Sequence, residues 1–382
     1  MRHPDCFMAV PPELKTIYEK SARMAESLFR DFKTGEIPQT LRQDLKESYD
    51  FYLDKETRGQ LAEMGTIKRW LYSSWHLAKS LFLKLTPTRR IILLIGFVLA
   101  ADGAQGDTGN LLMGFVALLF ILGLELKDKL LARDELQAGW AVQSALMPER
   151  RPTFQGWDTW LYTEPASDVG GDMVDCQLVE TDRFAISLGD VSGKGLPAAL
   201  FMAKLQATVR AISPSIRSLA ELGARVNEIF NRDSLPGRFA SLVYAEVSAK
   251  SPVVRFVNAG HLPPILVTTA GAREMKKGGP AIGLLPTARY VEVDVNLDFG
   301  DLLVIVSDGV TEARDSYGSF FGDDRLHRLL ETAHGRSAAE VGEFIIQAVT
   351  SFVGSARPSD DLSVAILRRK PEKLLPAASG VS

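Results

Sequence analysis

The sequence has little cysteine and almost no net charge. Its two cysteines, Cys6 and Cys176, lie far apart and form neither a disulfide framework nor a zinc-type cluster, which favours a reducing compartment. With 44 basic and 47 acidic residues, the net charge of −3 gives no global field that would recruit nucleic acid, so we expect no nucleic-acid partner. The first residues lack the apolar stretch of a secretory signal, so we expect the N-terminus to stay in the cytoplasm.

A length of 382 residues with 46% hydrophobic residues is about twice the usual size of one domain, which predicts more than one folded part. In residues 1–86 apolar side chains such as Leu14, Tyr18 and Leu28 recur at helical spacing. We therefore expect an all-α N-terminal region over residues 1–86, in the cytoplasm.

Two uncharged apolar runs, Ile91–Ala101 and Leu111–Leu124, enclose a polar turn that is rich in glycine. Each run is shorter than the roughly 20 residues that span a bilayer comfortably, so a buried soluble hairpin is an alternative. Arginine and lysine flank the outer ends and are absent from the turn, a pattern that keeps both ends in the cytoplasm. We predict a two-helix transmembrane hairpin over residues 87–126, in the inner (cytoplasmic) membrane.

A charged helix over residues 127–147 would link the hairpin to the rest of the chain. Its apolar residues do not keep a heptad repeat, so a homodimer through this linker helix is left open. Pro148 ends the helix, because proline cannot extend it. Residues 148–370 mix short strand-like runs with separate helices, which predicts an α+β domain whose helices cover sheet faces. The tail, residues 371–382, offers little to bury, and we expect it to be disordered.

The strands and helices of the α+β domain can be predicted individually from apolar runs and helical spacing. We expect strands at Trp157–Tyr162, Phe184–Leu188, Leu242–Val247, Val253–Val257, Ile265–Thr268, Val291–Val295, Leu302–Val306 and Leu362–Leu367, and helices at Leu196–Ala211, Ser218–Phe230 and Ala338–Val353.

Four aspartates stand beside glycines or at the ends of apolar strands: Asp172, Asp190, Asp308 and Asp360. A buried carboxylate needs a partner, because an isolated charge in an apolar core carries a severe desolvation cost. The surrounding motifs hold too few lysines and arginines to pair with all four. Carboxylate ligands without histidine or cysteine pairs favour Mg²⁺ or Mn²⁺ over zinc. The four aspartates therefore predict a divalent metal site. Gly193-Lys194 does not predict ATP binding, because Gly195 replaces the serine or threonine of a P-loop.

Several motifs follow one another in a recognisable order. They are Val169-Gly-Gly-Asp172-Met-Val-Asp175, Gly189-Asp190-Val-Ser-Gly-Lys-Gly195, Asn258-Ala-Gly-His261, Ser307-Asp-Gly-Val-Thr-Glu312 and Asp360-Asp361. With these motifs the chain, over roughly residues 134–369, resembles the SpoIIE/RsbU-like bacterial branch of the PPM metal-dependent serine/threonine protein phosphatases. The resemblance implies the PPM phosphatase fold, a two-layer antiparallel β-sandwich flanked by helices.

The resemblance also implies the roles of individual residues. Asp190 would bridge two metal ions, Mn²⁺ or Mg²⁺, with the Val191 carbonyl as a further ligand. Asp172, Asp308 and Asp360 would complete the catalytic cluster, whose ions activate a shared water for attack on the phosphate. Asp361 is the alternative to its neighbour, because one residue of register decides which side chain enters the cleft.

By the same resemblance, the substrate would be a phosphoserine or phosphothreonine protein, of the anti-sigma-factor antagonist type that acts in partner-switching control of sigma factors. The alternative is a catalytically silent PPM-fold module that regulates a signalling partner by binding. The intact aspartates argue against that alternative, because nothing structural requires four adjacent carboxylates.

For His261 we favour a structural hydrogen-bonding role over that of a general acid. Asp175 would hold waters near the metals or cap a turn, and Cys176 would pack in the core.

Overall fold

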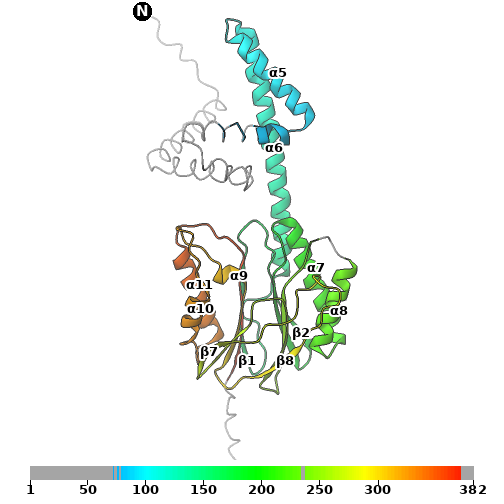
Figure 1. The fold of residues 1–382 in the computed structure, drawn as a ribbon, viewed down its shortest axis with the longest axis vertical. Helices are drawn as coiled ribbons and strands as arrows, with labels where there is room; N and C mark the ends of the chain where they lie inside the picture. Colours follow the sequence, from blue (N-terminus) through cyan, green and yellow to red (C-terminus); the bar gives the residue numbers. More distant parts are fainter. Residues whose placement is uncertain (1–71, 73–74, 77–78, 234–236, 371–382) are drawn as a thin grey trace, which may run out of the picture. The chain divides into compact units, whose positions relative to one another are not determined.

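The computed structural model describes residues 72, 75–76, 79–233 and 237–370 (Figure 1). Most of the helical region predicted for residues 1–86, and the tail predicted for 371–382, lie outside the described residues. The chain divides into two compact units, residues 1–128 and 129–382.

Helices α5 (Pro87–Gly103) and α6 (Thr108–Leu146) pack against each other as an antiparallel hairpin. Small residues allow the close approach, because a Cβ on Gly114 would lie only 2.6 Å from the backbone nitrogen of Ala100. At the open end of the hairpin Arg89 pairs with Glu125 at 2.6 Å and with Asp128 at 2.7 Å. Helix α6 continues without interruption to Leu146, so the second apolar leg and the charged linker helix are one element.

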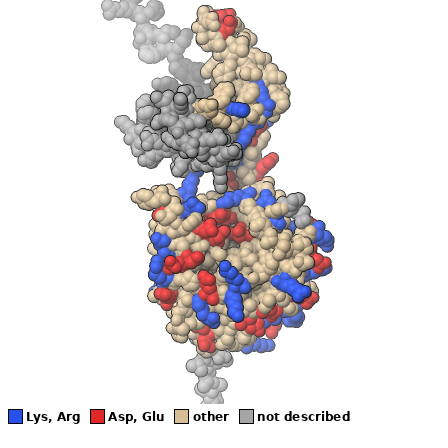
Figure 2. All heavy atoms as spheres, viewed as in Figure 1, with Lys and Arg blue, Asp and Glu red and all other residues tan. Residues whose placement is uncertain are grey.

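Among the described helices, α6 alone is both long and apolar enough to cross a membrane; α5 has 17 residues. The apolar side chains of the hairpin are largely exposed, Leu112, Phe120 and Leu122 by more than half. In Figure 2 the surface of this helical part is mostly uncharged, whereas basic and acidic side chains are interspersed over the visible face of the second unit. The exposed apolar surface of the hairpin therefore needs a partner outside the described chain.

The second unit contains two five-stranded antiparallel sheets. The first has the order β1 (Trp157–Glu164), β10 (Leu362–Arg369), β9 (Leu302–Val306), β6 (Ile265–Thr268) and β7 (Gly271–Glu274). The second has the order β2 (Met173–Glu180), β3 (Arg183–Gly189), β4 (Leu242–Ser248), β5 (Val253–Ala259) and β8 (Glu292–Asn296). Side chains from both sheets, Leu161, Ile186 and Ile305 among them, form one buried cluster between the two layers.

Helices cover the outer face of each sheet (Figure 1). Helices α7 (Leu196–Ile212) and α8 (Leu219–Arg232), joined through the 3₁₀ turn η1 (Ser213–Ser215), pack on the second sheet. Helices α10 (Asp323–Leu330) and α11 (Ala338–Val353) pack on the first sheet, and the short α9 (Asp308–Thr311) follows β9. The predicted antiparallel sandwich flanked by helices is confirmed.

Two oppositely charged side chains, Glu246 and Arg183, pair with each other in the interior of the second sheet. Glu246 on β4 is 2% exposed and accepts hydrogen bonds from Arg183 at 2.7 and 3.1 Å, from Arg255 at 2.7 Å and from the Tyr244 hydroxyl at 3.2 Å. The Arg183 side chain is itself only 9% exposed. Breaking such a pair leaves an uncompensated buried charge, which is the costly event in a buried ion pair.

We expect Glu246→Gln to lower the free energy of unfolding by about 3–5 kcal/mol, because the buried Arg183 guanidinium would lose its anion. Urea unfolding of the purified protein measures the change. Glu180→Gln is the matched control: Glu180 contacts the same arginine at 3.5 Å but is about one-third exposed, and its loss should cost about 1 kcal/mol or less. Equal losses in the two variants would contradict this account.

Candidate metal centre

The four predicted aspartates come from the ends of four strands, two in each sheet. In the second sheet, Asp172 precedes β2 and Asp190 follows β3, and these two strands are paired. In the first sheet, Asp308 follows β9 and Asp360 lies just before β10, and these two strands are also paired. Because the neighbouring strands run antiparallel, the end of one lies beside the beginning of the other. The carboxylates of Asp190, Asp308 and Asp360 interact electrostatically, so the ends of both sheets meet at one acidic cleft.

Burial and mutual repulsion raise the pKa values of these carboxyl groups. For Asp190 burial comes first, followed by the Asp308 and Asp360 carboxylates, and the pKa rises to about 7. The pKa of Asp308 is raised by burial and by Asp360. The pKa of Asp172 is raised well above its usual range, by burial and then by Asp190. The cleft therefore holds more negative charge than its own side chains can neutralise, which is an arrangement that a divalent cation relieves.

Two further observations fit a cation in this cleft. The Asp172 Oδ2 atom is buried without a hydrogen-bond partner, although Asp172 is only 5% exposed. A pocket of about 210 Å³ is lined by Gly171, which precedes Asp172, and by Asp190, Lys194 and Asp360 among others. Within the described residues no three His, Cys, Asp or Glu side chains are arranged to hold one ion by themselves. Magnesium keeps several waters and takes only one or two carboxylates, so the donor set still suits Mg²⁺ or a similar ion.

Asp361 has a different environment from its neighbour. Its Oδ1 accepts the backbone N–H of Ala166 at 2.8 Å, and its Oδ2 accepts those of Gly171 at 2.6 Å and Asp172 at 3.2 Å. Both oxygens of this buried carboxylate are thus occupied by the loop that precedes β2. We refer to this set of three hydrogen bonds as the Asp361 clasp.

Two glycines make the clasp sterically possible. A Cβ on Gly170 would lie 2.6 Å from Asp361 Oδ2, and a Cβ on Gly309 would lie 2.0 Å from the Asp361 carbonyl oxygen. Side chains at these positions would push the loops apart. Gly170 of the Gly-Gly-Asp motif and Gly309 of the Asp-Gly motif are therefore explained by close approach to one residue, Asp361.

Asp360 faces the cleft and solvent instead. Its side chain is 43% exposed, and its Oδ2 lies 3.0 Å from Lys194 Nζ, which also donates to the Ser359 carbonyl at 2.7 Å. Sequence reasoning gave Lys194 no role after excluding a P-loop. In the structure this lysine supplies a positive charge to the pocket lined by the aspartates.

His261 is buried beside the strand end that carries Asp190. Its Nδ1 lies 2.7 Å from Ser241 Oγ, which in turn accepts the Asp190 backbone N–H at 3.1 Å. Burial lowers the pKa of His261 to about 4, so the ring is neutral near pH 7. These contacts agree with the structural hydrogen-bonding role that we favoured.

Three other residues near the site, Asp175, Gln143 and Cys176, have defined contacts in the structure. The buried Asp175 carboxylate pairs with Arg210 of α7, at 2.7 Å from Nε, and accepts the Cys176 backbone N–H at 2.8 Å. Gln143, near the end of α6, exchanges two hydrogen bonds with Gly170, donating at 2.8 Å and accepting at 3.1 Å. Cys176 packs against the core between the sheets, as expected, and burial raises its pKa to about 11.

Two antiparallel sheets with helices on both outer faces, and acidic strand ends meeting at one cleft, define a domain of the PP2C type of fold. The structure of the SiaA-PP2C domain of Pseudomonas aeruginosa has the same fold, with a TM-score of 0.55 and 20% identity over 63% of this chain and 98% of that one. The family model described as stage II sporulation protein E (SpoIIE) matches residues 180–370. The chain belongs to the SpoIIE family.

Two curated relatives extend the similarity. The protein IcfG of Synechocystis sp. is 27% identical over 277 residues, which is 65% of this chain and 43% of that protein. The phosphoserine phosphatase RsbU of Bacillus subtilis is 25% identical over 240 residues, covering 62% of this chain and 71% of that protein. The chain thus spans less than half the length of IcfG.

The two neighbouring aspartates should respond differently to the same substitution. Asp361→Asn is expected to lower the free energy of unfolding by about 2–3 kcal/mol, because an amide nitrogen cannot accept the N–H groups of the clasp. Asp360→Asn removes a half-exposed ion pair and should cost about 1 kcal/mol or less. Thermal and urea unfolding, measured without added metal, compare the two variants. A larger loss in Asp360→Asn would show that the clasp is misassigned.

Proposed function

We propose that the protein is a metal-dependent phosphatase of phosphoserine and phosphothreonine proteins. The observation that carries this proposal is the acidic cleft, where Asp172, Asp190, Asp308 and Asp360 come together from both sheets around a buried carboxylate oxygen without a partner. Membership of the SpoIIE family and similarity to a phosphoserine phosphatase support the same reaction.

The cleft would hold two ions, Mn²⁺ or Mg²⁺. Asp190 would lie between them, with Asp172, Asp308 and Asp360 as the other carboxylate ligands. The carbonyl oxygen of Val191 would be a further ligand. A Cβ on Gly171 would lie 3.2 Å from this oxygen, so the oxygen is close to the loop that carries Asp172, which supports this role. When bound, the ions lower the pKa of a water and offset the charge of the phosphate.

The chain's own groups would orient this chemistry. Hydrogen bonds from the Asp190 backbone N–H to the Ser241 carbonyl at 3.2 Å and to the Ser241 hydroxyl at 3.1 Å fix the bridging residue. The Asp361 clasp fixes the Asp172 loop against the other sheet. Lys194, on the exposed side of the pocket, would balance the charge of Asp360 until a cation does so.

For the substrate we propose a phosphorylated anti-sigma-factor antagonist in a partner-switching pathway. Similarity to RsbU and the sequence motifs support this class. The competing function, a silent binding module, is disfavoured because all four carboxylates and the clasp that orders them are intact.

Asp190→Asn and Asp308→Asn should each reduce phosphate release by at least about a hundredfold, because the cleft loses a metal ligand. The assay uses p-nitrophenyl phosphate and a phosphoserine peptide with Mn²⁺. Chelation by EDTA should abolish turnover, and added Mn²⁺ should restore it. Asp294→Asn, an exposed aspartate of β8, is the control and should retain wild-type rates. Full activity in either cleft variant would refute the metal mechanism.

We further propose that α5 and the apolar part of α6 form a membrane hairpin whose turn faces away from the cytoplasm. The exposed apolar side chains of the hairpin and the basic residues at its open end support this orientation. Both the region before residue 87 and the phosphatase domain would then be cytoplasmic. Exposed Leu130, Trp140 and Val142 on the later part of α6 support a homodimer through residues 127–147.

A cysteine introduced at Gln105, in the turn, tests the hairpin after both native cysteines are replaced by serine. In intact cells Gln105→Cys should react with a membrane-impermeant maleimide, because the turn lies outside. Ser355→Cys in the phosphatase domain is the control and should react only after lysis. Equal protection of both sites in intact cells would contradict a spanning hairpin.

A further inference from the structure

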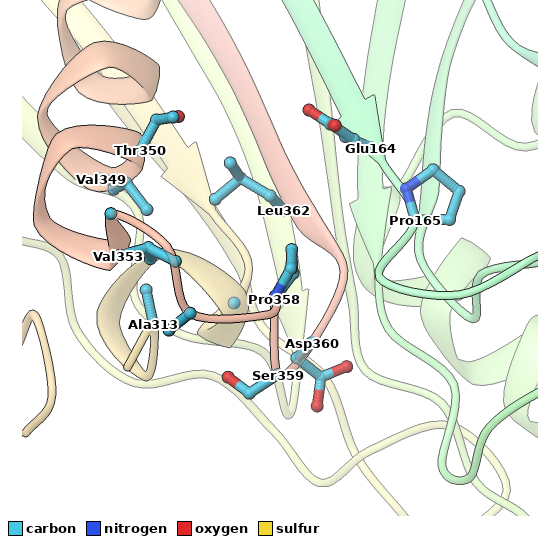
Figure 3. Close-up of a pocket in the computed structure, with 13 residues that line it drawn as sticks. Glu164, Pro165, Ala313, Val349, Thr350, Val353, Pro358, Ser359, Asp360 and Leu362 are labelled. Carbon is cyan, nitrogen blue, oxygen red and sulfur yellow. The ribbon is translucent and has the colours of Figure 1, made fainter. Parts of the chain in front are cut away.

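A second cavity lies directly beside the acidic cleft. It has a volume of about 290 Å³ and is walled by the end of β1, the last turns of α11 and the loop that leads to β10 (Figure 3). Pro358, Ser359 and Asp360 line both this cavity and the acidic pocket, so the two adjoin along this loop. We call it the α11 pocket.

The wall of the α11 pocket is largely aliphatic. Ala313, Val349, Val353 and Leu362 line it, and Figure 3 shows the two valines on α11 on one side and Leu362 on β10 beside them. Glu164 stands on the opposite side, where its carboxylate already accepts a hydrogen bond from the Tyr162 hydroxyl. The other carboxylate, Asp360, is paired with Lys194. An aliphatic group therefore fits this wall better than a further charge.

The size of the pocket limits its occupant. A volume of about 290 Å³ is at the lower end of the roughly 300–1,000 Å³ of small-molecule sites and has room for one or two side chains.

The pocket also has a continuation along the same helix. At Thr350 it adjoins a shallower hollow of about 420 Å³ between α11 and β1. There Trp160 and Tyr162 stack with ring centroids 5.6 Å apart, and Arg150 lies 4.9 Å over the Tyr162 ring. Trp160, Tyr162 and Glu164 alternate along β1, so they lie on one face of the strand. Two adjoining hollows thus lie between α11 and β1, and the first of them is next to the acidic cleft.

We propose that the α11 pocket receives an aliphatic side chain of the phosphoprotein substrate, close in sequence to the phosphorylated residue. This inference rests on the proposed phosphatase function and adds a specificity site to it. The phosphate would lie at the aspartates, while the neighbouring segment follows α11 through Thr350 toward Arg150. Burying an aliphatic group next to the reacting phosphate lets the enzyme select its substrate by more than the phosphate itself.

The test uses the full-length protein in detergent with Mn²⁺ and three kinds of substrate. These are p-nitrophenyl phosphate, a short phosphoserine peptide with alanine at every flanking position, and the same peptide with leucine placed at each flanking position in turn. We expect leucine at one of these positions to raise kcat/KM about tenfold over the alanine peptide. Lysine at that position should not have this effect.

Thr350→Trp should fill the junction of the two cavities and reduce the leucine-to-alanine ratio of kcat/KM to near one. Thr350 is exposed on α11, so the larger side chain can be accommodated without disturbing the core. Thr332→Trp is the matched control, the same change at an exposed threonine outside the two hollows, and should keep the preference. Unfolding temperatures of both variants verify that they are folded.

The possible outcomes separate the two proposals. Wild-type protein that hydrolyses p-nitrophenyl phosphate but shows no preference for leucine, or prefers lysine, overturns the α11 pocket alone. A leucine preference that survives in folded Thr350→Trp also overturns it. Wild-type protein that hydrolyses neither p-nitrophenyl phosphate nor any peptide overturns the phosphatase function itself.

Discussion

The acidic cleft depends on one buried carboxylate that is not itself among the proposed ligands. Asp361 joins the loop before β2, in one sheet, to the strand β10 of the other, through three backbone N–H groups. Charge-assisted hydrogen bonds of this kind are stronger than neutral ones, and here they act where four like charges would otherwise drive the two sheet edges apart. The clasp therefore holds together the framework on which the repulsive cluster is built.

Much of the fold could be predicted because its central elements are apolar throughout. Strands β6 and β9 and helix α11 begin and end at the predicted residues, since unbroken apolar runs or clear helical spacing mark them. Strands β2 and β7 and helix α10 escaped prediction. Strand β2 mixes apolar residues with Asp175 and Gln177, β7 has only four residues, and α10 is rich in charge, so periodicity gave no clear signal.

The site could be predicted only in part. Asp190 and Asp308 were correctly placed at strand ends, because an aspartate that follows an apolar run can be recognised from the neighbouring residues alone. The distinct environments of Asp360 and Asp361 depend on partners that are 166 residues away for Asp360 and 189 and 190 residues away for Asp361, which no local pattern records. The same holds for Glu246. In the sequence it resembles an ordinary polar residue of a strand, and only the folded sheet brings Arg183 and Arg255 into ion pairs with it.

Gly309 is a residue by which the packing of the two sheets around the acidic cleft can be recognised in other sequences. Its missing side chain leaves space for the Asp361 carbonyl oxygen, which would otherwise lie 2.0 Å from a Cβ. A related sequence could keep every acidic residue and still be unable to close its two sheets around them if any larger residue occupied this position. Surveys that separate working from silent members of the family by their aspartates alone would misassign such a chain, and the glycine would reveal it.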